Sequence, residues 1–304
     1  MRIISLFPAA TEIVCALGAG DMLVGISHDS DYPAEVLHSG IPRVTRSTID
    51  ASAPPGEIDR MVRAADALGN ALHVLDADAI ARLEPDLIIT QGICDVCAIR
   101  EADVRIIAES LRRPPILVSL SADVLDEMLN DIRRVGAAIG RWQVADALVE
   151  TLECRLRKVH ERLANAGVPR PRVAVLEWTN PIYNAGHWVP QMVRKAGGVE
   201  VLAKTGERSR VVSMTEVVAA RPDTVIVAPC GYNVARAAAE GAAQLKKSEW
   251  GTVARCRVWA MDSGGLLSRP GPRLVDGVET MAEIFHPSLF LRPSRSRAVQ
   301  LPAA

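Results

Sequence analysis

The chain has 304 residues, of which 49% are hydrophobic and 23% charged, and its formal net charge is −1. The length suits two domains with a core each, and the composition excludes a disordered chain. The near-neutral charge argues against nucleic acid as the main partner, and no apolar run reaches the roughly 18 residues of a membrane span.

Short apolar segments alternate with helical patterns through the first 120 residues. Residues 7–10 are expected to form a tight connection, and residues 33–44 a crossover rich in loops. The alternation predicts a parallel sheet with helices on both sides, in which residues 87–90 form a strand buried on both faces. We expect strands at residues 2–6, 23–26, 87–90 and 116–118, and helices at 11–17, 57–68, 76–83 and 104–111.

Two helices are expected in the middle of the chain. The first runs from an N-cap at Ser121 to residue 139, where Gly136 and Gly140 break it. The second spans residues 141–167 and is about 40 Å long. We interpret it as a helix that joins two halves, and an ordinary surface helix of one large domain is the alternative. Its apolar stripe at three-four spacing consists of Trp142, Ala145, Leu148, Val149, Leu152, Leu156, Val159 and Leu163.

The second half of the chain repeats the pattern of the first. Residues 80–94 and 217–231 each contain a short helix, a Pro-Asp turn, an apolar strand and a loop with a cysteine. Two similar halves favour the joining role of the long helix. Strands are expected at 173–176, 224–228 and 257–260, and helices at 189–195, 215–220, 234–245 and 274–285. The predicted domains are an amino-terminal lobe at 1–120, a helix leading to the hinge at 121–140, a bridging helix at 141–167, a carboxy-terminal lobe at 168–290 and a tail at 291–304.

Ligands of open parallel sheets bind beyond the carboxyl ends of the strands, so the loops at these ends are the candidate site. Cys94 and Cys97 form a C-x-x-C pair in one such loop, and Cys230 lies in the equivalent loop of the second half. The thiols suit redox or metal chemistry, or simple packing in tight loops. No second cysteine pair stands at zinc-ribbon spacing.

An aromatic loop is expected at residues 178–188. Trp178 and Trp188 offer flat faces for a flat ligand, although a lid over the end of the sheet is the alternative. His187 is the histidine best placed to reach a metal. Arg269, in a proline-rich turn before the last helix, suits an anionic or amide group of a ligand, or a structural salt bridge.

Known catalytic motifs are absent from the sequence. We find no phosphate-binding loop of the G-x-x-x-x-G-K-[ST] type, no H-E-x-x-H, no G-x-S-x-G and no dinucleotide glycine pattern after the first strand. We therefore expect that the protein is not an enzyme and has no catalytic residues, no catalytic cofactor and no protein-held metal.

Five segments in order resemble the helical-backbone substrate-binding proteins of ABC importers, and most of all their cobalamin-binding members. The resemblance implies two Rossmann-like three-layer α/β lobes with parallel-rich sheets, joined by one long helix, with the ligand between the lobes and little lobe closure. Siderophore, haem and corrinoid binders share this fold, so the fold alone does not choose the ligand. The segments are residues 2–12, 24–33, 85–90, 196–198 and 222–227.

The resemblance also assigns roles to individual residues. Gln91 stands where cobalamin binders can have a tryptophan, and Trp178 where they have an aromatic residue, whereas a tryptophan expected near Ser209 is missing. Asp78 and Glu200 lie at or beside the acids that dock on the permease of the importer. The predicted ligand-binding residues are Phe7, Pro8, Ala9, Tyr32, Gln91, Cys94, Trp178, His187, Trp188, Cys230, Tyr232 and Arg269.

We therefore expect a monomer that holds cobalamin or a related corrinoid non-covalently for uptake by an ABC importer. The alternatives are a binder of haem, a siderophore or another metal chelate, and a cytosolic thiol or metal enzyme that uses Cys94 and Cys97. The apolar start of the chain is too short for a secretory signal, and six cysteines are few for a disulfide framework. The expected compartment is the cytoplasm as written, or the periplasm or cell surface if the amino terminus was trimmed.

Overall fold

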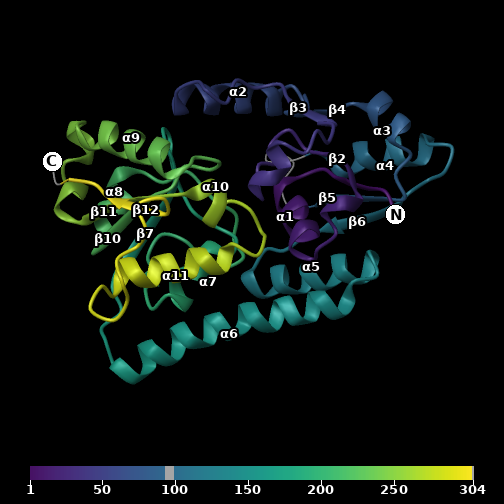
Figure 1. Cartoon of the computed structure of the whole chain (residues 1–304). Helices are drawn as coiled ribbons and strands as arrows, with labels where there is room; N and C mark the ends of the chain where they lie inside the picture. Colours follow the sequence, from purple (N-terminus) through teal and green to yellow (C-terminus); the bar gives the residue numbers. More distant parts are fainter. Residues whose placement is uncertain (93–98, 303–304) are drawn as a thin grey trace. The chain divides into compact units, whose positions relative to one another are not determined.

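The computed structural model describes residues 1–92 and 99–302, and Figure 1 shows the course of the chain with labels on most helices and strands. The chain divides into two compact units. Unit 1 consists of Met1–Ala122 and Asp126–Glu150, and unit 2 of Asp123–Leu125 and Thr151–Ala304. None of the described helices combines the length and the hydropathy that a transmembrane span requires.

A four-stranded parallel sheet forms the centre of unit 1. Its strand order is β2-β1-β5-β6, with β1 at Ile3–Ser5, β2 at Leu23–Ile26, β5 at Leu87–Gln91 and β6 at Ile116–Leu120. Leu87, Ile88 and Ile89 are almost fully buried, as expected for a strand covered on both faces. The helices of this unit are α1 (Pro8–Ala16), α2 (Pro55–Ala67), α3 (Ala77–Leu83), α4 (Glu101–Ser110) and α5 (Leu125–Ala138), with 3₁₀ turns at Gly20–Met22 and Ala34–Leu37.

Unit 1 also contains a small sheet that the sequence analysis missed. Strands β3 (Thr45–Ser47) and β4 (His73–Leu75) pair antiparallel, with Ser47 opposite His73, and α2 lies between them in the sequence. Each strand is only three residues long, which is too short for an alternating pattern to be visible. The predicted loop-rich crossover therefore leads into a second, separate sheet.

Helix α1 begins earlier than predicted. Pro8 is its first residue, so residues 8–10, predicted as a tight connection, form the first turn instead. Proline suits this position because its fixed φ matches a helix and its missing N–H would have no partner there. As a consequence Ala9 is fully buried in the core.

The start of α5 also differs from the prediction. The helix begins at Leu125 and not after an N-cap at Ser121, and the Leu125 N–H donates to the side-chain oxygen of Gln191 at 2.7 Å. A side chain distant in sequence thus accepts a hydrogen bond from a backbone N–H at the start of the helix, where a local N-cap was expected to do so. Gly136 lies inside α5 and does not break it, whereas Gly140, with φ of 72°, follows its end.

Helix α6 spans Trp142–Ala166, close to the predicted 141–167, and contributes residues to both units (Figure 1). The predicted stripe is mostly correct, since Ala145, Val149 and Leu152 are buried. Trp142 is the exception, because 59% of it is exposed. Within unit 2, the Arg155 guanidinium of α6 bonds the carboxylates of Asp276 and Glu279, with Nε to Oε1 of Glu279 at 2.9 Å.

Unit 2 is built around a six-stranded sheet of order β12-β11-β10-β7-β8, with β9 also paired to β7. Strands β9, β7, β10 and β11 run parallel, and β8 and β12 are antiparallel to their neighbours. The last strand comes from residues that were predicted to be a tail. The strands are β7 (Arg172–Thr179), β8 (Ile182–Asn184), β9 (Val199–Glu200), β10 (Thr224–Val227), β11 (Arg257–Met261) and β12 (Ala298–Gln300). The helices are α7 (Val189–Lys195), α8 (Met214–Ala219), α9 (Val234–Leu245), α10 (Ser263–Leu266) and α11 (Leu274–Phe285), with 3₁₀ turns at Ser248–Trp250 and Val253–Arg255.

The parallel strands of the two units follow the same order. In unit 1 the order is β2-β1-β5-β6, and in unit 2 it is β9-β7-β10-β11, so the first strand lies between the second and the third in both. The Pro-Asp turn before the third strand is repeated in detail. Asp86 Oδ2 accepts from the Arg2 N–H at 2.7 Å, and Asp223 Oδ2 accepts from the Arg172 N–H at 2.8 Å.

Candidate functional site

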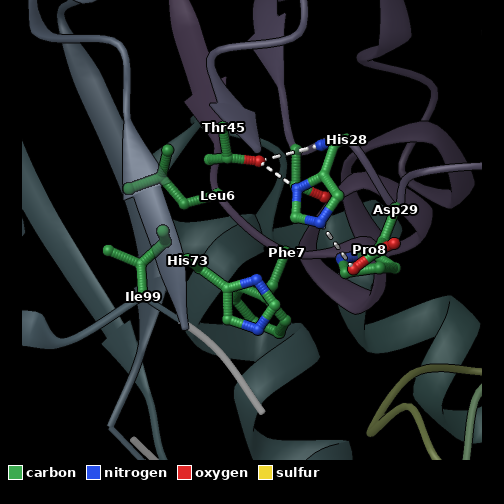
Figure 2. A pocket seen from close by; sticks show the side chains of 9 residues that line it. Leu6, Phe7, Pro8, His28, Asp29, Thr45, His73 and Ile99 are labelled. Carbon is green, nitrogen blue, oxygen red and sulfur yellow. Dashed lines mark hydrogen bonds and ion pairs between the residues drawn. The ribbon is translucent and has the colours of Figure 1, made fainter. Parts of the chain in front are cut away.

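A small hollow lies at the carboxyl end of the sheet in unit 1. Strand β1 has β2 on one side and β5 on the other, and the strand order reverses at this point, where ligands of open parallel sheets bind. The hollow has a volume of about 20 Å³, which is room for about one water molecule. Its lining residues are Leu6, Phe7, Pro8, Ser27, His28, Asp29, Thr45, His73 and Ile99 (Figure 2).

Buried hydroxyl groups hold the two loops that form this hollow. Ser5 bonds Thr11 at 2.8 Å, Thr11 bonds Ser30 at 2.8 Å, and Ser30 bonds Ser27 at 2.9 Å. The chain of bonds joins the end of β1, helix α1 and the loop after β2. Arg43 strengthens the same loop, because its guanidinium donates to the carbonyl oxygens of Ser27 and Ser30 at 3.0 and 2.6 Å. These hydrogen bonds therefore hold the backbone of the two loops that form the hollow.

His28 has a defined orientation in the hollow. Thr45 Oγ1 accepts from the His28 backbone N–H at 2.9 Å and lies 2.7 Å from its Nδ1, and the Asp29 carboxylate lies 3.3 Å from its Nε2 (Figure 2). A hydroxyl that donates to Nδ1 and a carboxylate that accepts from Nε2–H together favour the Nε2–H tautomer.

His73 faces His28 across the hollow. The centroids of the two imidazole rings are 5.4 Å apart, with 39° between the ring planes. His73 comes from β4 and Thr45 from β3, so the small antiparallel sheet delivers both side chains to the same place. Nδ1 of His73 is buried, while the residue as a whole is partly exposed.

Unit 2 presents an aromatic group at the carboxyl end of its own sheet. Trp178, near the end of β7, meets Tyr232 edge-on, with ring centroids 5.7 Å apart. The Arg236 guanidinium lies 3.7 Å from the centre of the Tyr232 ring. Burial raises the pKa of the Tyr232 hydroxyl. Trp178 is partly exposed and packs on the core of the unit.

Polar groups from two further strand ends lie beside this aromatic group. The loop after β10 carries Cys230, which is exposed, and Gly231, whose N–H approaches Ser268 Oγ at 3.4 Å. Ser268 in turn bonds Ser263 at 2.5 Å, at the start of α10 after β11. Asp262 caps α10 by accepting from the Gly265 N–H at 3.1 Å. These hydroxyl and backbone groups bond to one another beside the aromatic group.

The predicted binding residues divide into several groups. Phe7 and Pro8 line the hollow of unit 1, whereas Ala9 is buried in the core. Tyr32 is 42% exposed, and Gln91 lies at the end of β5. Cys94 and Cys97 lie outside the described residues, so their roles stay predictions.

Three of the predicted aromatic and histidine residues have structural partners. Trp188 is 7% exposed and its indole N–H donates to the Leu267 carbonyl at 2.6 Å. Tyr232 is 4% exposed. His187 Nδ1 lies 3.0 Å from the Asp123 carboxylate. These positions favour a structural role for the three residues, while Trp178, Cys230 and the partly exposed Arg269 stay predictions for ligand contact.

The two predicted docking acids have different surroundings. Asp78 is exposed in the first turn of α3, as docking on a permease requires. The Glu200 carboxylate is buried in unit 2 and accepts from the Leu202 N–H at 2.8 Å, and burial raises its pKa to about 8. This position does not favour docking for Glu200.

Sequence reasoning missed His28 and His73. His28 follows β2 directly, so the rule that ligands bind beyond strand ends was sufficient to select it. No comparable signal marks His73, because its strand β4 is short and the partner strand β3 lies on the far side of α2 in the sequence.

Comparisons with known proteins agree with this architecture. A family described as periplasmic binding protein matches residues 3–251, and the chain belongs to this family. It is 24% identical to the ABC transporter substrate-binding lipoprotein YvrC of Bacillus subtilis, over 95% of this chain and 81% of that protein. It is 25% identical to a vitamin B12-binding protein of Vibrio cholerae, over 91% of this chain and 86% of that protein.

A solved structure extends the comparison to the fold. The crystal structure of a periplasmic heme-binding protein from Pseudomonas aeruginosa matches with a TM-score of 0.72 and 21% identity, covering 98% of this chain and 97% of that chain. The predicted two-lobe α/β fold with parallel-rich sheets is thereby confirmed. The family consists of binding proteins and not of enzymes, so the prediction of a non-catalytic protein is confirmed as well.

The chain is thus a substrate-binding protein of the type that serves ABC uptake systems, and the family implies a small ligand and a permease partner. The family is described as periplasmic, so the cytoplasmic location expected from the amino terminus receives no support from it.

Proposed function

We propose that the protein binds cobalamin or a related corrinoid and delivers it to an ABC importer on the outer side of the cytoplasmic membrane. The vitamin B12-binding protein of Vibrio cholerae, similar over nine tenths of this chain, supports this ligand. The structural observation that carries the proposal is the partly exposed ring of Trp178 near the carboxyl end of β7 in unit 2.

The chemistry of both strand-end regions suits a corrinoid. A corrin ring is flat and apolar on its faces and carries amide groups on its edge. Trp178 in unit 2 is partly exposed and supplies aromatic surface for a face of the ring, and Pro8 in unit 1 is a partly exposed apolar residue at the carboxyl end of its own sheet.

Haem is the second candidate. The likeness in fold to a periplasmic heme-binding protein favours it, as does the imidazole of His73 in the hollow of unit 1. The two ligands share a flat metal-containing ring, so they have to be compared directly.

Calorimetry with cyanocobalamin and with haemin tests the proposal. Cyanocobalamin is expected to bind with a Kd below about 1 μM, and haemin more weakly. Replacing Trp178 by Ala should weaken cyanocobalamin binding by about tenfold or more, because a stacking surface is lost. Trp142→Ala is the matched control, since Trp142 is exposed on α6, and should change the Kd by less than about twofold. Absence of heat with cyanocobalamin contradicts the proposal, and tighter binding of haemin replaces it with the second candidate.

A further inference from the structure

A positively charged residue lies in the first turn of α9. Asn233 caps this helix, and its side-chain oxygen accepts from the Arg236 N–H at 2.9 Å. None of the described residues in this first turn is acidic. Because the free N–H groups at the start of a helix carry partial positive charge, a cation there is unfavourable. The guanidinium of Arg236 therefore needs a contact that offsets this cost.

The face of the Tyr232 ring provides such a contact. The central carbon of the Arg236 guanidinium lies 3.7 Å from the ring centre, well within the roughly 6 Å over which an aromatic face attracts a cation. The attraction grows as water is excluded, and here Tyr232 is buried while Arg236 is partly exposed. The cation therefore holds one face of the tyrosine ring.

Hydrogen bonds fix the backbone of Tyr232 at the ends of two strands. Its N–H donates to the Pro229 carbonyl at 2.9 Å, and its own carbonyl accepts from the N–H groups of Ser263 and Gly264 at 3.0 and 3.1 Å. Pro229 lies after β10, and Ser263 begins α10 after β11. With the backbone fixed, the orientation of the ring depends on what packs against it.

Trp178 is the second side chain that packs against the ring of Tyr232. The two rings meet edge-on, with centroids 5.7 Å apart and 66° between their planes. Trp178 lies near the carboxyl end of β7 and is only partly buried, so fewer neighbours restrict its ring than restrict a core side chain. Tyr232 is one of the groups that set the orientation of the indole.

We propose that Arg236 is a positioning residue for ligand binding at Trp178. It holds the face of Tyr232, and Tyr232 in turn holds the indole of Trp178 in the orientation that stacks on a flat ligand. A ring that already has the bound orientation loses little rotamer freedom on binding, which strengthens the affinity. This inference rests on the proposed function, and it states how unit 2 prepares its aromatic surface for the ligand.

A double-mutant cycle with cyanocobalamin tests the inference. Arg236→Met removes the charge and keeps a long side chain, and it should raise the Kd by about three- to tenfold. In the Trp178→Ala background the same substitution should change the Kd by less than about twofold, because the ring through which Arg236 acts is gone. An arginine that contacted the ligand itself would keep its full effect in that background.

Two further variants provide the controls. Arg162 of α6 makes the same kind of contact with the ring of Phe290, at 4.9 Å from its centre, and neither residue belongs to a loop at the carboxyl end of a strand. Arg162→Met should change the Kd by less than about twofold. Arg236→Lys keeps a cation near the face of Tyr232 and should bind about two- to threefold more tightly than Arg236→Met.

Near-UV circular dichroism gives a readout that needs no ligand. The contribution of Trp178 is the difference between the spectrum of a protein and that of the same protein with Trp178→Phe. A tryptophan ring with a fixed orientation gives a strong signal, and a loosened ring gives a weak one. Arg236→Met should reduce the Trp178 contribution by about half or more, while the signal of the other tryptophans stays.

The outcomes separate the two proposals. If the wild-type protein does not bind cyanocobalamin, the proposed corrinoid function fails, and the Trp178 signal in Arg236→Met still decides the positioning role. If it binds, a Kd that Arg236→Met leaves unchanged, or an effect that persists in the Trp178→Ala background, overturns the positioning role and corrinoid binding stands. An unchanged Trp178 signal in Arg236→Met, or an equal loss of binding in Arg162→Met, overturns it as well.

Discussion

Glu200 lies in a strand of only two residues, and its carboxylate is buried although the residue as a whole is partly exposed. Its partner across the ladder is Val173 of β7, and its carboxylate accepts from the Leu202 N–H. Burial raises the pKa of this carboxyl from about 4.5 to about 8, and the backbone N–H groups around it oppose the shift only in part. The protonated form is therefore favoured in the folded protein at neutral pH.

The stability of the protein should fall as pH rises from about 4.5 to about 8. In this range the folded state keeps the Glu200 proton and the unfolded state has lost it, so the free energy of unfolding falls by about 1.4 kcal/mol for each pH unit from this group. The contribution of Glu200 to the free energy of unfolding is complete below about pH 4.5 and lost above about pH 8. Glu200→Gln should remove this part of the slope in urea unfolding measured from pH 5 to 8.

An exposed acid serves as the control for this measurement. Asp78→Asn, on the surface of α3, should keep the wild-type dependence of stability on pH. An unchanged slope in Glu200→Gln means that the buried carboxylate is not the titrating group.

Residues that carry the candidate site were only partly predictable. Phe7 and Pro8 could be selected because they follow the first strand directly. Trp188 looked equally suitable in the sequence, yet its ring is buried and its N–H bonds the Leu267 carbonyl. A sequence pattern indicates that an aromatic residue is near a strand end, but the neighbours that bury it come from distant segments.

Helices α5 and α6 pack closely where Gly136 meets Ala145. A Cβ placed on Gly136 would lie 2.4 Å from the Ala145 Cβ, far closer than two methyl groups can approach. The glycine therefore serves as a contact point inside a helix and not as a helix breaker.

Gly136→Ala should destabilise the protein by about 1–2 kcal/mol. The overlap costs about 1–3 kcal/mol, and the better helix propensity of alanine returns part of it. The double variant with Ala145→Gly moves the methyl group to the other helix and should recover at least half of the loss in chemical denaturation. Independent, additive effects of the two substitutions would contradict a direct contact.

The whole molecule contains the same strand order twice. In each copy, an aspartate and the backbone of an arginine form two hydrogen bonds with each other. Asp86 N donates to the Arg2 carbonyl at 2.8 Å, and Asp223 N donates to the Arg172 carbonyl at 2.8 Å. The carboxylates of Asp86 and Asp223 return bonds to the same arginine backbones. Glu84 and Arg221, which precede the two prolines, share the left-handed conformation with φ of 39° and 45°.

Removing one of these aspartates should loosen its own unit only. Asp86→Ala is expected to cost about 1 kcal/mol and to speed amide hydrogen exchange in β1 and β5, because a bond from a carboxylate to the backbone is lost. Asp223→Ala should have the same effect in β7 and β10. Faster exchange in the sheet of the other unit would show that the two contacts are not local.

Local patterns were sufficient for most of the long elements. Helices α7, α9 and α11 and strand β2 have the predicted ends, because apolar periodicity and flanking glycine or proline act within one segment. The repeated Pro-Asp turn also indicated the two similar halves. The two similar α/β halves were therefore visible in local patterns, whereas the role of a binding protein followed only from the resemblance to a known family.

Tertiary structure decided the features that depend on distant residues. Gln191 sets the start of α5, the short strands β3 and β4 find each other across α2, and residues 298–300 join the edge of the second sheet as β12. The same applies to the hollow, where the rings of His28 and His73 lie close together although the two residues are 45 positions apart in the sequence. Segments of three residues have too little periodicity to predict their pairing, and only the packed chain brings their side chains together.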